Sequence, residues 1–151
     1  MDEKNRTEGR GPALPGAPGA EPVTAADGAA AEQNLALFDR LDFEAWNNRD
    51  WDLFRQLHGD DVHVSGYGAT TNGIDEHVGW AEAVLAQVPD AKIIGHPIRI
   101  GAGDWTAVVG VNSDGSTAAT IARWEGGRIA EEYLFSLVTG AGDAGSGTPT
   151  S

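Results

Sequence analysis

Cysteine is absent from this chain of 151 residues. Its absence excludes disulfide bonds, zinc sites built on thiolates and a cysteine nucleophile. Long apolar runs are also missing: no stretch approaches the roughly 20 apolar residues that a membrane-spanning helix needs, and the first thirty residues lack the apolar segment of a signal peptide. We therefore expect a cytoplasmic protein that has no contact with membranes.

Basic residues are scarce. Ten Lys and Arg face 23 Asp and Glu, which gives a formal net charge of −13. A charge of this sign repels phosphate backbones, so nucleic acid is disfavoured as a partner. The glycine-containing stretch "GYGATTNG" lacks the lysine and the glycine spacing of a nucleotide-binding loop. His77 and His96 have no partners at metal-binding spacing, and we expect neither a metal site nor another cofactor.

Large apolar residues are almost missing from both ends of the chain. Residues 1–31 are rich in Gly, Pro and Ala, and residues 139–151 are rich in Gly, Ser and Thr. Neither segment buries enough apolar surface to offset the entropy lost by ordering its backbone. We expect two disordered tails around a single folded domain over residues 32–138.

Apolar residues at three- and four-residue spacing come first in this domain and predict helices over residues 32–48, 50–58 and 74–88. Asp50 is a plausible N-cap of the second helix. The period then changes to two, which predicts strands over residues 91–100, 104–112, 116–124 and 128–138, after an earlier strand over residues 61–67. Short "DG" and "GG" links favour antiparallel hairpins. Helices grouped before strands indicate an α+β fold with a curved antiparallel sheet.

Four stretches resemble the SnoaL-like polyketide cyclases of the nuclear-transport-factor-two-like superfamily: "AWNNRDWDLFRQLHGDDVHV", "TTNGIDEHV", "GDWTAVVGV" and "RWEGGRIAEEYLF". The resemblance covers nearly all of residues 33–137. It implies a cone-shaped mixed sheet with three helices around an apolar pocket. It also implies a homodimer formed through the outer face of the sheet.

The chain departs from this family at its catalytic positions. The aspartate that shuttles a proton in SnoaL-like cyclases aligns with Leu134. The general base of the related ketosteroid isomerases aligns with Gly66, and their oxyanion-stabilising aspartate aligns with Thr120. An activity of this type would therefore need other residues.

Two adjacent glutamates lie in the last predicted strand, and successive side chains of a strand point to opposite faces. Glu132 shares the parity of Leu134 and is expected to point into the pocket, where burial would raise its pKa. The structural alternative is a salt bridge from Glu132 to Arg123 or Arg128. Glu132 is our first candidate for an acid/base catalyst.

Asp42 is the one acidic member of the apolar face of the first helix. Paired inward with Glu132, it would share a proton, so that one carboxyl donates while the other accepts. Alternatively, Asp42 extends a polar helix edge beside Asp39 or pairs with Arg49. His58 is the third catalytic candidate, although a histidine at a helix end is also favoured simply by the helix dipole.

The remaining assignments concern the pocket wall and the outer face. Trp46 and Trp80 are expected to wall the cavity against a flat ring, although tryptophans at helical spacing are also common in cores. His63 alternates with inward valines and should lie on the outer face. The expected lining residues are Trp46, Trp80, Thr106, Thr120 and Leu134.

These expectations support two hypotheses of different classes. The first is a cofactor-free enzyme that isomerises or cyclises a hydrophobic, ring-containing, polyketide-like metabolite by proton transfer. The second is a non-catalytic module of the same fold that binds a small ligand or dimerises. A raised pKa of Glu132 would favour the enzyme, and an ordinary or lowered one the binding module. An oxygenase-like role, which recurs among SnoaL-like relatives, is a third alternative.

Overall fold

The computed structural model describes residues 21–136. The tail predicted for residues 139–151 and most of the tail predicted for residues 1–31 lie outside this range. The predicted start of the folded unit at residue 32 needs correction, because that residue lies inside the first helix and a strand precedes it. That strand pairs with a later one, and the pairing had no signal in the local sequence.

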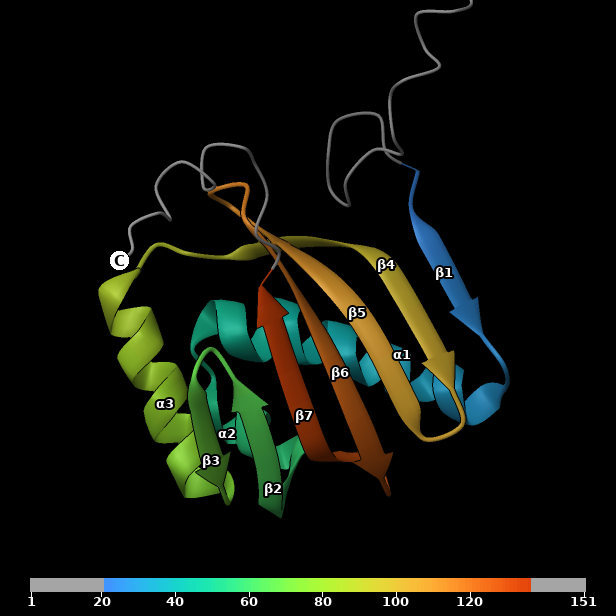
Figure 1. Ribbon diagram of the computed structural model, residues 1–151, viewed down its shortest axis with the longest axis horizontal. Coiled ribbons are helices and arrows are strands. Elements are labelled where there is room, and N and C mark those ends of the chain that lie inside the picture. Colours follow the sequence, from blue (N-terminus) through green and yellow to red (C-terminus); the bar gives the residue numbers. More distant parts are fainter. Residues whose placement is uncertain (1–20, 137–151) are drawn as a thin grey trace, which may run out of the picture.

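Within the described residues, one curved sheet of seven strands has the order β1-β4-β5-β6-β7-β2-β3 (Figure 1). The strands are β1 (Val23–Ala26), β2 (His58–Gly66), β3 (Ala69–Asn72), β4 (Ile93–Ala102), β5 (Trp105–Asn112), β6 (Thr117–Glu125) and β7 (Arg128–Ser136). The central hairpins are antiparallel, whereas β1–β4 and β2–β7 are parallel pairs. The sheet is therefore mixed.

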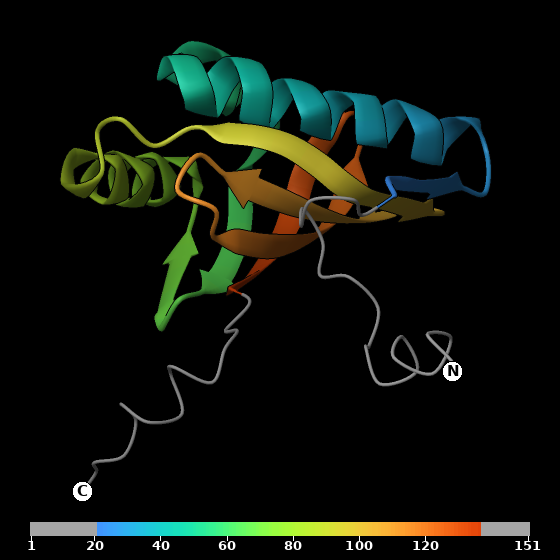
Figure 2. The same ribbon diagram turned by 90° about the horizontal axis from the view of Figure 1, so that it is seen from above.

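The helical segments are α1 (Ala29–Arg40), the π-helix η2 (Leu41–Trp46), α2 (Trp51–Gln56) and α3 (Ile74–Gln87). Helix α1 runs across one face of the sheet, and α3 covers one end of it beside β2 and β3 (Figure 2). No helix among residues 21–136 combines the length and apolar character required to cross a bilayer. The predicted α+β cone is confirmed as an unclosed, mixed sheet with helices on one face.

The first predicted helix is divided into α1 and η2. Its apolar stripe faces the sheet, with Leu35, Phe38 and Leu41 at most 3% exposed. In η2 the backbone widens, and the N–H of Asn47 donates to the carbonyl of Asp42, five residues earlier. Such wide turns are frequent at functional sites. This one holds Asp42 at the level of the cavity described below.

Helix α2 begins as predicted, because the side chain of Asp50 accepts a hydrogen bond of 3.1 Å from the N–H of Leu53. It ends at Gln56, however, so His58 belongs to β2 instead of a helix end. Part of the stretch "GYGATTNG", for which no strand was predicted, forms β3. Short polar strands such as β3 lack the apolar alternation from which a strand is predicted.

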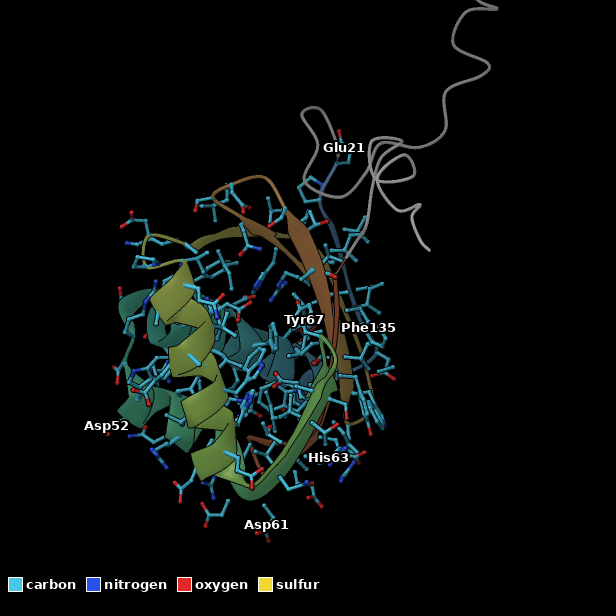
Figure 3. The ribbon with its side chains drawn as sticks, turned by 60° about the vertical axis from the view of Figure 1, so that its left-hand side comes forward. Glu21, Asp52, Asp61, His63, Tyr67 and Phe135 are labelled. Atoms are coloured by element: carbon cyan, nitrogen blue, oxygen red, sulfur yellow. The ribbon has the colours of Figure 1, made fainter. Side chains whose placement is uncertain are left out.

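The outer face of the sheet carries the residues that the strand alternation assigned to it. His63 and Phe135 lie on the side of the sheet facing away from the helices (Figure 3). Glu131 accepts hydrogen bonds from Arg123 and Tyr133, so Arg123 is not the partner of Glu132. Phe135 is 53% exposed. A homodimer through this face stays a prediction, which sedimentation of the full chain would test.

Candidate functional site

A cavity of about 500 Å³ lies between the helices and the concave face of the sheet. Its apolar wall comes from side chains of α1, η2, α2, α3 and the sheet. Its titratable side chains include Asp42, Tyr67, His77 and Glu132. The cavity is therefore mainly apolar, with a few groups capable of acid/base chemistry, which is typical of a small-molecule site.

Four of the five predicted lining residues reach this cavity: Trp46, Trp80, Thr120 and Leu134. Trp46 and Trp80 come from different helices, and their ring centroids are 6.4 Å apart. Thr106 was placed wrongly. It is 2% exposed, does not line the cavity, and its hydroxyl accepts a hydrogen bond of 2.9 Å from the indole N–H of Trp124.

Asp42 is the centre of the first titratable cluster. Its Oδ2 lies 2.7 Å from Nε2 of His96, and Nδ1 of His96 lies 2.8 Å from Oδ1 of Asp39. Arg99 donates to both oxygens of Asp39, at 3.0 and 2.7 Å. Both ring nitrogens of His96 thus face carboxylates, an arrangement that a doubly protonated imidazolium satisfies. The prediction that His96 stands alone is wrong.

The environment of this cluster changes two pKa values. Burial raises the pKa of Asp42, and the nearby charges of Glu132 and Asp39 act in the same direction, against the lowering effect of His96. Burial lowers the pKa of His96, but its hydrogen bonds and charge interactions with Asp42 and Asp39 outweigh burial and leave the pKa raised. A carboxyl group with a raised pKa is a stronger base once it is ionised.

Glu132 is the centre of the second cluster. It is 4% exposed, and its Oε2 lies 3.2 Å from Nε2 of His77 and 3.7 Å from Nε2 of His58. The parity argument therefore placed this glutamate correctly inside. Its partners were not predicted: His77 does not stand alone, and Arg128 pairs with Asp60 instead.

The expected direction of the Glu132 pKa was wrong. Burial acts to raise it, but the nearby imidazoles of His58 and His77 together outweigh burial and lower the pKa of Glu132 to about 2. Glu132 is therefore a permanent anion near neutral pH. Asp42 and Glu132 also do not share a proton, because the hydrogen-bond partner of Asp42 within residues 21–136 is His96.

His58 was expected at a helix end, and the structure corrects this position by placing it in β2. Its side chain is fully buried, and its Nδ1 lies 2.7 Å from the carbonyl oxygen of Phe54. It is not among the residues that line the cavity. His58 lies behind His77 and Glu132, the two cavity residues that it contacts.

Tyr67 is a cavity residue that the sequence did not reveal. It follows β2 with a φ of 52°, a left-handed conformation that is uncommon outside glycine. Its ring stacks on Trp80 at an interplanar angle of 5°, and half of the residue is exposed. Burial raises its pKa, as do the charges of Asp42 and Glu132, so its hydroxyl remains a donor. The signal in the sequence was only a tyrosine before glycine in a turn.

The three positions where the resemblance placed family catalysts meet on adjacent strands. Gly66 and Thr120 both pair with Leu134 in the sheet. A Cβ at position 66 would come within 2.5 Å of the Cβ of Leu134, so no side chain fits there. This part of the wall has no ionisable group, and the chemistry of the cavity depends on Asp42, His77, Glu132 and Tyr67.

The model of the SnoaL-like domain matches residues 41–132. The chain belongs to the SnoaL-like domain family. The matched region includes η2, both buried carboxylates and their histidine partners. Among curated proteins, no sequence matches the chain.

Solved structures show the same fold at low sequence identity. The chain is 20% identical to IdmH from Streptomyces antibioticus, a candidate polyketide cyclase, over 69% of this chain and 91% of that one, with a TM-score of 0.61. It is 19% identical to a candidate ketosteroid isomerase from Kribbella flavida, over 73% and 82%, with a TM-score of 0.62. A nuclear-transport-factor-two-like protein of unknown function from Mesorhizobium loti is 18% identical over 77% and 100%, with a TM-score of 0.64.

Proposed function

We propose that this SnoaL-like protein is an enzyme that moves a proton on a hydrophobic, ring-containing, polyketide-like metabolite, in an isomerisation or cyclisation. The observation that carries this proposal is the Asp42–His96 pair at the wall of an apolar cavity. The fold, and a structural neighbour described as a candidate cyclase, support the reaction class. Asp42 replaces Glu132 as the main acid/base group in this proposal.

The reaction begins with Asp42 as the base. Its carboxylate accepts a proton from a carbon next to a carbonyl group of the bound ring, and the electrons of the broken C–H bond move onto the carbonyl oxygen as an enolate. In an isomerisation, the protonated Asp42 then returns the proton to another carbon of the conjugated enolate, and the carbonyl forms again. In a cyclisation, the enolate carbon bonds to a second carbonyl carbon, the electrons of that C=O bond move onto its oxygen, and the protonated Asp42 gives its proton to this oxygen. Proton transfer of this kind contributes about 10²- to 10⁴-fold to a rate.

Neighbouring residues would assist these steps. His96, held by Asp39, orients the carboxyl of Asp42 through the 2.7 Å hydrogen bond. The hydroxyl of Tyr67, at the same cavity, donates to the developing enolate oxygen. Trp46 and Trp80 supply flat surfaces for a ring.

Deuterium exchange tests this proposal without knowledge of the product. Cyclic ketones and aromatic polyketide fragments that bind the purified full chain are incubated with it in D₂O, and NMR follows loss of the carbon-bound proton. Wild-type protein is expected to accelerate exchange, and Asp42→Asn should lower the rate by about 10²-fold or more while binding persists. Exchange that is equally fast in Asp42→Asn would contradict the role of Asp42.

Asp39→Asn is the matched control, because it removes the same charge from the opposite side of His96, at a residue that does not line the cavity. It should slow exchange by about tenfold with little change in binding, since it leaves the base in place but loosens His96. A loss as large as that of Asp42→Asn would show that both carboxylates act as one unit.

A second function is favoured by one specific observation. The lowered pKa of Glu132 and its pairing with two histidines are what a non-catalytic ligand-binding module would show. Under this alternative, ring-containing ligands bind in the cavity, but neither wild type nor Asp42→Asn exchanges their protons. The deuterium experiment therefore separates the two functions.

A further inference from the structure

We propose that His58, His77 and Glu132 together bind one divalent transition-metal ion at the wall of the cavity. This site goes beyond the proposed function and does not depend on it, because Asp42 and His96 are not among the ligands. The inference rests on the geometry of three buried side chains, which come from β2, α3 and β7.

The distances suit a common metal ion. One ligand atom from each of the three residues lies within 4.8 Å of the others. From Glu132 Oε2, the imidazole Nε2 atoms lie at 3.2 Å (His77) and 3.7 Å (His58). Ligands bound to zinc at about 2.0–2.2 Å are separated from each other by roughly 3–3.5 Å. Both separations from Glu132 Oε2 are therefore within a few tenths of an ångström of those in a zinc site.

Unsatisfied atoms point to the same conclusion. Nδ1 of His58 lies 2.7 Å from the carbonyl oxygen of Phe54, which requires a proton on Nδ1. Nε2 of His58 is fully buried and has no hydrogen-bond partner. In the neutral tautomer its lone pair faces the carboxylate of Glu132 at 3.7 Å, an arrangement of two acceptors that a cation between them would stabilise. A carbonyl that orients the far nitrogen is the usual outer partner of a metal-bound histidine.

The site is also open on one side. His77 and Glu132 line the cavity, whereas His58 lies behind them with no exposed surface. Three protein ligands leave coordination positions free for water or a ligand oxygen, as in catalytic zinc sites and in iron sites with two histidines and one carboxylate. A metal ion here would supply a Lewis acid or an acidic water to the cavity. Two imidazoles favour zinc, iron, cobalt or nickel over magnesium and calcium.

An alternative occupant of this space is a proton. A doubly protonated His77 or His58 would form an ion pair with Glu132 and satisfy the same carboxylate. The metal ion and the proton differ in one measurable respect, because only the metal site gives the protein a stoichiometric affinity for metal ions.

Metal titration of the full chain tests the proposal. Tag-free protein treated with EDTA and dialysed is titrated with Zn²⁺ by calorimetry and with Co²⁺ by visible absorption. We expect one ion per chain, with Co²⁺ bands typical of four or five ligands. Glu132→Gln and His77→Gln should each weaken binding by roughly 100-fold or more, since even outer partners of metal ligands contribute about 10- to 100-fold.

Two controls remove the same chemical groups elsewhere. His63→Gln deletes a histidine on the outer face, and Asp42→Asn deletes another carboxylate that lines the cavity; both should bind Zn²⁺ like the wild type. The proposal is overturned if the wild-type protein binds Zn²⁺ no more tightly than Glu132→Gln does. It is also overturned if His63→Gln weakens Zn²⁺ binding as much as Glu132→Gln does. If the Glu132 and His77 variants do not fold, X-ray absorption of the Zn²⁺-loaded wild type decides: two imidazoles and one carboxylate oxygen support the site, and any other ligand set refutes it.

The results distinguish this inference from the proposed enzyme. Absence of metal binding leaves proton exchange by Asp42 untouched. Exchange that is absent while Zn²⁺ binds through His58, His77 and Glu132 would refute the role of Asp42 and keep the metal site.

Discussion

Two buried carboxylates at the same cavity, Asp42 on η2 and Glu132 on β7, have pKa values that move in opposite directions. Burial opposes ionisation of both. Glu132 faces two imidazoles, which outweigh burial, whereas Asp42 has one, His96, whose other nitrogen is engaged by Asp39. Because burial acts alike on both groups, the number of imidazole partners decides in which direction each pKa moves.

The two clusters also differ in how the chain positions them. Glu132 and His58 lie on directly paired strands, β7 and β2. Asp42 depends on a wide helical turn and on a long-range contact with His96 of β4. Two paired strands thus supply Glu132 and His58, with His77 added from α3, whereas the Asp42 cluster joins a helical turn to a single strand.

Neutralising each carboxylate should affect stability very differently. Glu132→Gln leaves two buried histidines without their anion, and we expect the free energy of unfolding to fall by about 3 kcal/mol. Asp42→Asn removes a carboxyl whose ionisation is opposed by burial and keeps an acceptor for His96, so its change should stay within about 1 kcal/mol. Urea unfolding of metal-free protein at neutral pH measures both values, and equal losses would show that the clusters do not differ.

In this comparison, the sequence predicted the side chains of the sheet better than those of the helices. Strand alternation is a local property, so the inward position of Glu132 and the outward positions of Glu131 and His63 followed from parity alone. The apolar spacing in α1 and η2 likewise placed Asp42 on the inner face. The fold class was predictable because apolar residues recur with a period of about 3.6 in the helical segments and of two in the strands.

Partner choice could not be predicted in the same way. His96 is 54 residues from Asp42 in the chain, and His77 and Glu132 come from different elements. Which histidine meets which carboxylate depends on the packing of η2 and α3 against the sheet, which no local pattern encodes. The mistaken direction of the Glu132 pKa had this origin, since burial was predictable from parity and the two imidazoles were not.

The pH dependence of stability provides a second test of the Asp42 cluster. The pKa of His96 is raised above 6.5 in the folded protein, so from about pH 6.5 up to that raised value the native state holds a proton that the unfolded chain has released. The stability that the raised pKa of His96 contributes should be complete below about pH 6.5 and should decline as pH rises through the folded pKa of His96. Unfolding in urea at several pH values between about 6 and 9 measures this slope.

His96→Gln should flatten the slope over this range, whatever it does to stability itself. His63→Gln, which removes an imidazole from the outer face, should leave the slope as in the wild type. A wild-type slope that persists in His96→Gln would assign the titration to another group.

The smallest expected effect concerns the space beside Asp42. A methyl group at Gly110 would lie 3.6 Å from Ile93, 3.8 Å from His96 and 3.9 Å from Asp42 Oδ2, all ordinary contacts, in a cavity that Gly110 lines. Gly110→Ala should therefore keep or slightly raise stability, by up to about 1 kcal/mol, and weaken binding of ring-containing ligands several-fold by narrowing the approach to Asp42.

Gly79→Ala is the matched control, because an added Cβ there meets nothing within 4 Å on the exposed side of α3. If Gly110→Ala binds ligands as tightly as Gly79→Ala does, the bound ring does not approach Asp42, and the proton-transfer role loses its geometric basis.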